Sequence, residues 1–250
     1  MNKVAIITGS SGGIGQALVK TYLDDGYFVI GLDRNPSDSI TSEFYIAIEV
    51  NLLSFSNDKT YQVDFLKKIK ECLPRKIKKF IIVNNAAKQV LKPVAEIEWI
   101  DWEHSLAVNT IAPFFLVQGF IKELSAYQGH VINISSIHSK LTKTKFTCYA
   151  ASKAALESLT RSLALELSPI GISINAIAPA AISTEMLKAS FDDKPEKFNE
   201  LESYHPSKRI GTPTQTASLV KAITDQEGGF LSGSVIDFSG AIASRLYDPN

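Results

Sequence analysis

Seven short apolar runs alternate with longer helical patterns along most of the chain. Several runs are apolar almost throughout, not at every second residue, as strands are when both faces of a sheet are covered. Strand–helix alternation of this kind predicts a mostly parallel, doubly wound α/β sheet flanked by helices. The predicted strands span residues 4–8, 27–33, 44–50, 80–84, 130–135, 172–177 and 234–238. The predicted helices span residues 14–24, 58–72, 99–124, 148–167 and 214–224.

The chain has 250 residues, of which 45% are apolar and 21% charged, so a full-sized globular core is available. This length suits one α/β domain or two small ones, and no linker divides the chain, so we expect one domain over residues 1–250. Residues 183–213 are polar and charged and follow no strand pattern. Long irregular inserts in compact domains are usually functional or mobile, so we expect a lid here with one or two short helices. A simple surface excursion is the alternative.

Charge and cysteine usage exclude several classes of partner. Lysine plus arginine and aspartate plus glutamate each number 26, so the formal net charge is zero. Without a basic excess we expect no binding to nucleic acid or to a membrane surface. Cys72 and Cys148 lie far apart and outside any C-x-x-C pair, which indicates neither a metal site nor a disulfide framework. No apolar stretch approaches the roughly 20 residues of a membrane span, and the first run is too short for a signal peptide, so we expect a cytoplasmic protein.

A glycine-rich turn, T-G-S-S-G-G-I-G over residues 8–15, follows the first predicted strand and opens the first predicted helix. Backbone N–H groups at a helix N-terminus lack partners and carry partial positive charge, and a pyrophosphate satisfies both. Glycine is needed because a Cβ would block close approach of the backbone or demand an unfavourable φ. The context favours a dinucleotide-binding turn of the Rossmann type over a plain tight turn. The expected contacts in this turn are Gly9, Ser11, Gly13, Ile14 and Gly15.

The second predicted strand ends in Asp33, which Arg34 follows. An acidic residue about 20 positions after the glycines is suited to bind the adenosine ribose hydroxyls of NAD, and its charge repels the extra phosphate of NADP. An arginine beside it could instead pair with that phosphate. A turn-capping Asp33 with a solvated Arg34 is the alternative without a cofactor role. We expect NAD to be favoured over NADP.

Tyr149 and Lys153 are four residues apart near the start of the predicted helix 148–167, so they share one helix face. A free tyrosine, with a pKa of about 10, exchanges protons poorly near neutral pH. The lysine cation and the positive ring of an oxidised nicotinamide favour the phenolate and are expected to lower this pKa. Tyr149 could then exchange a proton with a substrate alcohol or carbonyl while hydride passes to or from the cofactor.

Ser136 lies at the end of the predicted strand 130–135. Ligands of doubly wound sheets bind outside the carboxyl ends of the strands, so its hydroxyl can hydrogen-bond a substrate oxygen. A cap or turn serine is the alternative interpretation. Ser136, Tyr149 and Lys153 together are therefore the candidate catalytic residues.

With these motifs in order, the chain resembles the compact short-chain dehydrogenases/reductases over essentially its whole length. The family motif T-G-x-x-x-G-x-G matches the turn at residues 8–15. The family's N-N-A-G motif matches residues 84–87, with alanine in the last position, and its helix asparagine matches Asn109. The family's serine, tyrosine and lysine match the three catalytic candidates named above.

The resemblance implies a role for each matched residue. Tyr149 would be the general acid/base, Ser136 would orient the substrate oxygen, and Lys153 would bind the nicotinamide ribose and tune the tyrosine. Asn109 would hold a water that links Lys153 to solvent, although a helix asparagine could equally bond backbone groups. The implied reaction interconverts a secondary alcohol and a ketone of a small molecule, in a homotetramer or homodimer. Beyond the turn, the expected cofactor contacts are Asp33, Arg34, Asn51, Asn85, Ala86, Ala87, Tyr149, Lys153, Pro179, Ile182 and Thr184.

Three residues depart from the family pattern. Asn51 stands where an aspartate commonly contacts adenine, and its side chain can still hydrogen-bond there. Ala87 replaces a glycine next to the cofactor, and its methyl group is expected to shift the backbone slightly. Ala180 replaces the glycine of the usual P-G, so the backbone near the nicotinamide is expected to be less free.

Substrate choice should depend on side chains around the open end of the sheet. His138 is expected to line the pocket together with Ser136 and Tyr149, not to act as a second base. Four lysines near this end of the sheet could favour an anionic substrate, but we expect them to be solvated surface residues. The remaining candidates are Lys88, Gln89, Ile137, residues 144–146 and the lid, and the lysines are Lys88, Lys140, Lys143 and Lys145.

Two other functions stay open. One is an NADPH-dependent 3-oxoacyl-thioester reductase, which is a common activity in this family. The other is a cofactor-binding regulator that keeps the fold but not turnover. The intact catalytic set argues against the regulator, since a pure binder needs no proton relay.

Overall fold

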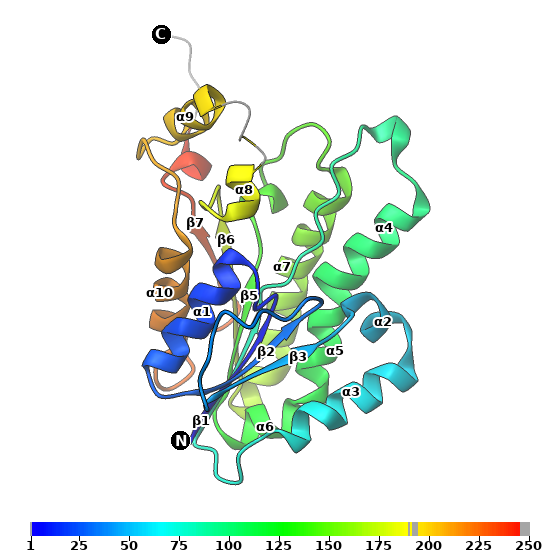
Figure 1. Ribbon diagram of the computed structural model, residues 1–250, viewed down its shortest axis with the longest axis vertical. Helices are drawn as coiled ribbons and strands as arrows, with labels where there is room; N and C mark the ends of the chain where they lie inside the picture. Colours follow the sequence, from blue (N-terminus) through cyan, green and yellow to red (C-terminus); the bar gives the residue numbers. More distant parts are fainter. Residues whose placement is uncertain (1, 190, 192–194, 246–250) are drawn as a thin grey trace.

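A computed structural model describes residues 2–189, 191 and 195–245, and over these residues seven parallel strands form one sheet (Figure 1). The strand order is β3-β2-β1-β4-β5-β6-β7. Each strand begins and ends within two residues of its predicted bounds, so the predicted sheet is confirmed. The strands are β1 Lys3–Thr8, β2 Phe28–Asp33, β3 Tyr45–Glu49, β4 Lys79–Asn84, β5 His130–Ile134, β6 Ser173–Pro179 and β7 Val235–Phe238.

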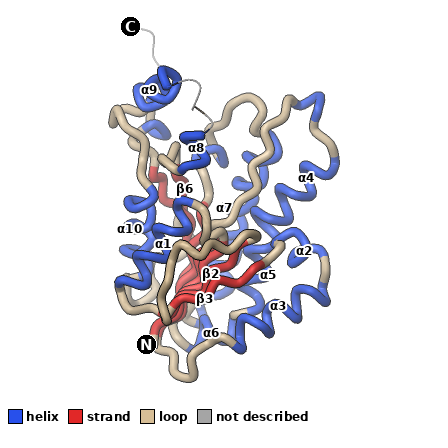
Figure 2. The backbone as a smooth tube through the Cα atoms, in the orientation of Figure 1, coloured by secondary structure: helices blue, strands red, loops and turns tan. Residues whose placement is uncertain are grey.

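Helices cover both faces of the sheet (Figure 2). The central strands contribute side chains to the core on each face. On β1, Val4 and Ile6 pack into the core on one face, and Ala5 and Ile7 pack into the core on the other. All four side chains are fully buried, which explains why the apolar runs do not alternate with polar residues. The first face carries α3 Lys59–Glu71, α5 Ala112–Gly119 and α7 Thr147–Leu167, and the second carries α1 Gly13–Asp24 and α10 Pro213–Thr224.

The direction in which strands are added reverses between β1 and β4. The chain proceeds from β1 to β2 and β3 on one side, and from β4 through β7 on the other. Because all strands are parallel, their carboxyl ends share one edge, and ligands of such sheets bind outside that edge at the reversal. The glycine turn after Thr8, the segment after Asn84 and the turn after Ile134 all leave the sheet there.

The single helix predicted over residues 99–124 is wrong, because the structure divides this stretch into four pieces. Pro113 lies inside it and has no N–H to donate to the carbonyl of Asn109, four residues earlier. The chain forms a π-helical turn just before the proline, in which the Ala112 N–H donates to the Ala107 carbonyl. The pieces are α4 Trp99–Leu106, the π-helical turn Ala107–Ile111, α5 and α6 Ile121–Ala126.

Short helices appear at two other places. Helix α2, Leu52–Asn57, was not predicted, and the Asn51 side chain caps it by accepting from the N–H groups of Leu53 (3.0 Å) and Ser54 (3.4 Å). Within the predicted lid, α8 (Glu185–Ala189) and α9 (Pro195–Tyr204) match the expectation of one or two short helices. Residues 190 and 192–194 of that lid fall outside the described residues.

Candidate active site

The glycine turn is packed too closely to admit side chains at two of its positions. Gly9 has φ +66°, and a Cβ on it would lie 2.8 Å from the Ala86 Cα. A Cβ on Gly15 would lie 1.9 Å from the Gly9 carbonyl oxygen. Both glycines are therefore required by the fold of the turn itself, before any ligand is considered.

Polar groups around the turn match a pyrophosphate. No side chain caps the N-terminus of α1, where Gly12 is the cap residue, and its first turn carries no acidic residue. The hydroxyls of Ser10 and Ser11 are buried and have no hydrogen-bond partner among the described residues. Unsatisfied donors at an uncapped helix N-terminus suit an anionic ligand, so the residues present fit a dinucleotide.

Asp33 lies at the carboxyl end of β2, directly beside this turn. Its carboxylate accepts from the Ser11 N–H (2.9 Å) and from the Asn35 N–H (3.0 Å), which fixes its orientation. Each oxygen keeps a lone pair for a ligand hydroxyl. Arg34, next to it, is exposed.

The segment after β4 is attached to the end of β1. The Thr8 hydroxyl accepts from the N–H groups of Asn85 and Ala86, both at 3.0 Å. The Asn85 amide donates to the carbonyls of Thr8 and Gly9, also both at 3.0 Å. Both side-chain amide hydrogens of Asn85 are therefore donated to the glycine turn and position it. Neither hydrogen remains for a bond to a cofactor.

The structure accommodates the three departures from the family pattern. Ala87 and Ala180 are not among the described residues with positive φ, so neither alanine requires the left-handed conformation that would favour glycine. Asn51 is exposed, and its amide oxygen is occupied by capping α2. Its Nδ2 is therefore the group that remains for the expected contact with adenine.

The remaining predicted cofactor contacts lie in the segment after β6 and in α1. Thr184 packs closely against the glycine turn: a Cβ added to Gly13 would lie only 3.0 Å from the Thr184 Cγ2. Its hydroxyl also accepts from the Leu187 N–H (3.2 Å) at the start of α8. Ile182 is buried and forms an isolated parallel bridge with Gly211. Pro179 ends β6 in a buried position, and Ile14 packs against the core beneath α1.

The three catalytic candidates come together at the carboxyl end of β5. Ser136, in the turn after that strand, is buried, and its hydroxyl lowers the pKa of the neighbouring Tyr149. Lys153, one turn further along α7, is 1% exposed, and its Nζ donates to the Ile134 carbonyl (2.7 Å). The same ammonium lies 5.8 Å from the centroid of the Tyr149 ring. The predicted sharing of one helix face is thus confirmed in space.

Burial governs the charge states of this pair. It raises the pKa of Tyr149 above its usual 10, and the Ser136 hydrogen bond offsets this only in part. It lowers the pKa of Lys153 to about 7. In the protein itself desolvation of the phenolate dominates, so the expected lowering of the tyrosine pKa by Lys153 and an oxidised nicotinamide together stays a prediction.

Asn109 lies in the π-helical turn and is fully buried. Its side-chain oxygen accepts from the Lys88 N–H (2.7 Å), and its amide donates to the Lys88 carbonyl (2.9 Å) and to the Ser152 hydroxyl (2.8 Å). The backbone-bonding alternative is therefore observed. The side chain connects the segment after β4 to α7, one residue before Lys153, and its water relay stays a prediction.

His138 forms part of an aromatic wall beside Tyr149. Its ring stacks on Phe146 with centroids 4.3 Å apart and lies 6.1 Å from the Tyr149 ring. Burial, and secondarily the charge of Lys143, lower its pKa from 6.5. Among the lysines considered for substrate binding, Lys140 pairs with Asp237 at 3.2 Å.

Sequence reasoning missed two buried polar features near this site. Glu157, one turn after Lys153, is 3% exposed, and its carboxylate accepts from serine hydroxyls of the turn after β5. The Asn84 amide donates to Asn133 (2.8 Å), whose own amide donates to Thr160 (2.9 Å). The available signal was polar residues at positions that the strand and helix patterns assign to the interior.

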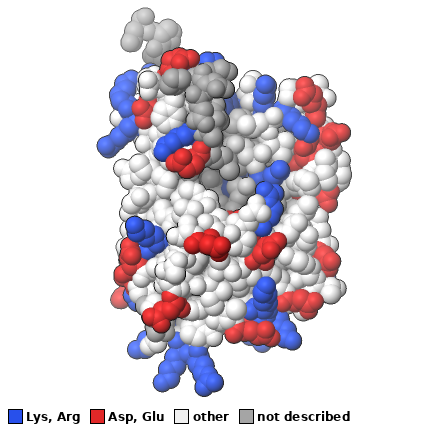
Figure 3. Space-filling model, in the orientation of Figure 1, with Lys and Arg blue, Asp and Glu red and all other residues white. Residues whose placement is uncertain are grey.

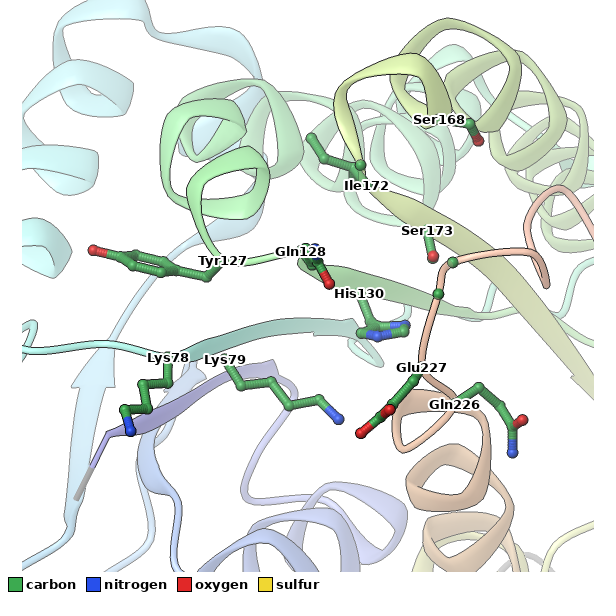
Figure 4. Close-up of a pocket in the computed structure, with 13 residues that line it drawn as sticks. Lys78, Lys79, Tyr127, Gln128, His130, Ser168, Ile172, Ser173, Gln226 and Glu227 are labelled. Carbon is green, nitrogen blue, oxygen red and sulfur yellow. The ribbon is translucent and has the colours of Figure 1, made fainter.

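A cavity of about 540 Å³ lies at the opposite, amino-terminal edge of β4, β5 and β6 (Figure 4). Lys79, His130 and Glu227 line it together with Ser173. It is therefore separate from the edge that carries Tyr149. Burial first, and the charge of Lys79 second, lower the pKa of His130 from 6.5 to about 4.

This shift predicts acid sensitivity. The unfolded chain binds a proton on His130 below about pH 6.5, whereas the folded chain does so only near pH 4, so stability is lost as the pH falls through this window. Through His130, the wild type should lose about 3 kcal/mol of unfolding free energy between these pH values, and His130→Gln should not show this loss. Urea unfolding at a series of pH values between 4 and 6.5 measures the unfolding free energy. His104→Gln on α4 is the control and should lose stability as the wild type does. An equally steep loss in His130→Gln would contradict the assignment.

Charged side chains of both signs are interspersed over the face shown in Figure 3. The described residues contain no cluster of three or more metal-ligating side chains. Nor does the described part of the chain contain a helix long and apolar enough to cross a membrane.

Comparisons with known proteins agree on one family. The short chain dehydrogenase family matches residues 3–195. Protein FixR of Bradyrhizobium diazoefficiens is 31% identical, and the match covers 95% of this chain and 86% of FixR. The structure of ElxO with NADP bound has a TM-score of 0.86 and 25% identity, covering 98% of this chain and 100% of that one. The structure of 4-hydroxyisoleucine dehydrogenase complexed with NADH has a TM-score of 0.84, 25% identity and the same coverage.

Proposed function

The chain belongs to the short-chain dehydrogenase family, and on that premise we propose that it interconverts a secondary alcohol and a ketone, using NAD and with Tyr149 as general acid/base. It is an NAD(P)-dependent oxidoreductase acting on CH–OH and C=O groups. The observation that carries the proposal is the grouping of Ser136 and Tyr149 with the buried Lys153, whose Nζ lies 5.8 Å from the Tyr149 ring centroid. This group stands at the sheet edge that also carries the glycine turn.

In the proposed reaction, Tyr149 exchanges a proton with the substrate oxygen. Ser136 donates a hydrogen bond to the same oxygen and holds it in place, in keeping with its position beside the phenol. For oxidation of an alcohol Tyr149 must be a phenolate, and for reduction of a ketone it must be a phenol. The aromatic wall of His138 and Phe146 shields the pair from water on one side.

The residues that would hold the dinucleotide are the glycine turn, Asp33, Asn51, residues 85–87, Tyr149, Lys153 and the segment 179–184. When bound, the nicotinamide accepts or supplies the hydride and, in its oxidised form, brings the positive charge that favours a phenolate. Lys153 would bind the nicotinamide ribose. Its pKa of about 7 suits a residue that passes protons at neutral pH. Asn109 would hold the relay water beside it, supported by its place next to Ser152.

We expect NADH to bind about tenfold more tightly than NADPH. Two backbone N–H groups hold the Asp33 carboxylate at the end of β2, where it would accept from ribose hydroxyls and repel a 2′-phosphate. Fluorescence titration with both cofactors measures the two affinities. Asp33→Ala should reduce the difference between the NADH and NADPH affinities. The opposite preference would overturn the choice of NAD and assign the phosphate to Arg34. Both NADP and NADH occur in the related solved structures, so the choice needs this measurement.

A substrate panel tests the proposed activity and separates it from the alternatives. The panel contains simple ketones, sugars, steroids and 3-oxoacyl thioesters, with oxidation or reduction followed by NADH or NADPH absorbance. Turnover of an alcohol–ketone pair with NAD(H) supports the proposal. Turnover only of acyl thioesters with NADPH supports the reductase. Cofactor binding without turnover of any compound supports the regulator.

Assembly as a homotetramer or homodimer remains part of the proposal. Large apolar side chains are exposed on α4 and α7, including Trp99 (80%) and Leu165 (83%). Such residues are typical of surfaces that a partner subunit covers.

A further inference from the structure

Glu157 presents a buried carboxylate that the proposed reaction does not use. It lies on α7, four residues after Lys153, and is 3% exposed. Burying a charged group costs free energy unless hydrogen bonds compensate it. Here the Ser135 hydroxyl donates to Oε1 (3.0 Å), and the Ser139 hydroxyl donates to the same oxygen. Hydrogen bonds to a charged acceptor are stronger than neutral ones, so these two are expected to hold firmly.

The two hydroxyls belong to residues on either side of Ser136. Residues 137–139 form a single 3₁₀ turn, and the Ser136 hydroxyl caps it by accepting from the His138 N–H (3.2 Å). Ser135 precedes this turn and Ser139 ends it, so Glu157 attaches both ends of the turn to α7. The same helix carries Tyr149, whose pKa the Ser136 hydroxyl lowers.

From this geometry we propose that Glu157 is a positioning residue, which holds the Ser136 hydroxyl against Tyr149 by binding Ser135 and Ser139. The inference rests on the proposed function, because it assigns to Glu157 the orientation of that reaction's serine. Without the carboxylate, the turn after β5 loses its attachment to α7. The Ser136 hydroxyl is then no longer held beside Tyr149, so it orients neither the substrate oxygen nor the phenol.

The first test reads the state of Tyr149 directly. Protein labelled with ¹³Cζ-tyrosine is titrated as the NAD⁺ complex, and the Tyr149 signal is the one missing from Tyr149→Phe. The Ser136 hydrogen bond lowers the pKa of Tyr149, so Glu157→Ala should raise that pKa by about one unit. Glu157→Gln keeps an oxygen acceptor for both serines and should titrate like the wild type. Glu166→Ala, which removes an exposed carboxylate from the same helix, is the matched control.

Kinetics with a substrate from the panel provide the second readout. Glu157→Ala should lower kcat about tenfold or more, while the KM for NAD⁺ changes less than about twofold, since the cofactor turn is untouched. The acid limb of the pH profile for alcohol oxidation should move upward with the Tyr149 pKa. Ser139→Ala removes one of the two hydroxyls that Glu157 binds, so it should lower kcat in the same way but by less. This variant keeps the inference testable if Glu157→Ala folds poorly.

A double variant separates positioning from general stability. If Glu157 acts through Ser136, then Glu157→Ala adds little to the effect of Ser136→Ala on the Tyr149 pKa. An unchanged Tyr149 titration in Glu157→Ala, or full additivity with Ser136→Ala, overturns the inference. Failure of the wild type to bind NAD(H) counts against the proposed function instead, so the two failures are distinguishable.

Discussion

Tyr149→Phe is expected to lower turnover by about three orders of magnitude while NADH binds with nearly unchanged affinity. The phenol is the proposed proton donor and acceptor, and general acid–base groups contribute about 10²–10⁴ in rate. The substitution removes only the hydroxyl, so the ring keeps its contacts with His138 and Phe146. The measurement pairs steady-state rates on the best panel substrate with fluorescence titration of NADH.

Tyr127→Phe is the matched control, because Tyr127 lies at the opposite edge of the sheet beside the cavity there. It loses a phenolic hydroxyl without touching the candidate site and should keep wild-type turnover. Retained turnover in Tyr149→Phe would remove the residue from the proton-transfer role. Loss of NADH binding in that variant would instead indicate a structural role for its hydroxyl.

Gly15→Ala is expected to weaken NADH affinity by about a hundredfold or more. The new Cβ would lie 1.9 Å from the Gly9 carbonyl oxygen and 2.8 Å from the Ser10 Cα. Both contacts are with backbone, so the glycine turn itself must move and the uncapped N-terminus of α1 loses its shape. Overpacking of this kind costs about 1–3 kcal/mol in stability. NADH titration and thermal unfolding measure the two effects separately.

Gly12→Ala provides the matched control within the same turn. Its Cβ would meet only the Gly9 carbonyl oxygen, at an ordinary 3.5 Å, and Gly12 has φ −76°, which alanine adopts readily. We expect this variant to unfold like the wild type. Equal loss of NADH affinity in the two variants would show that close packing at Gly15 is not the reason that the turn needs glycine there.

The strands were predictable because burial on both faces leaves a continuous apolar run that local sequence displays directly. The helices were predictable where one apolar stripe repeats without interruption, as in α7. The prediction for residues 99–124 was wrong because Pro113 breaks the hydrogen-bond ladder in the middle of an otherwise helical pattern. Helix α2 was missed because six residues are too short to show periodicity, although Asn51 is a typical cap.

The candidate site was predictable as a set of residues but not as a set of contacts. The amide hydrogens of Asn85 hold the turn after β1, a contact that the sequence did not indicate, and its expected contact with the cofactor stays a prediction. Glu157 was missed because a glutamate in a helix is usually exposed, although its position four residues after Lys153 places it on the buried face of α7. Asn109 was left open between water relay and backbone bonding, and the backbone bonds are present.

The spacing of Tyr149 and Lys153 depends on local geometry alone, and the sequence determined it: residues four apart on a helix share a face wherever the helix lies. The same holds for the glycine turn between strand and helix. The ionisation of the pair was decided only by the tertiary structure. Burial raises the pKa of Tyr149 and lowers that of Lys153, and the serine that lowers the tyrosine pKa lies after a strand end, 13 residues earlier in the chain. Desolvation and such contacts depend on what packs around a side chain, which no local pattern encodes.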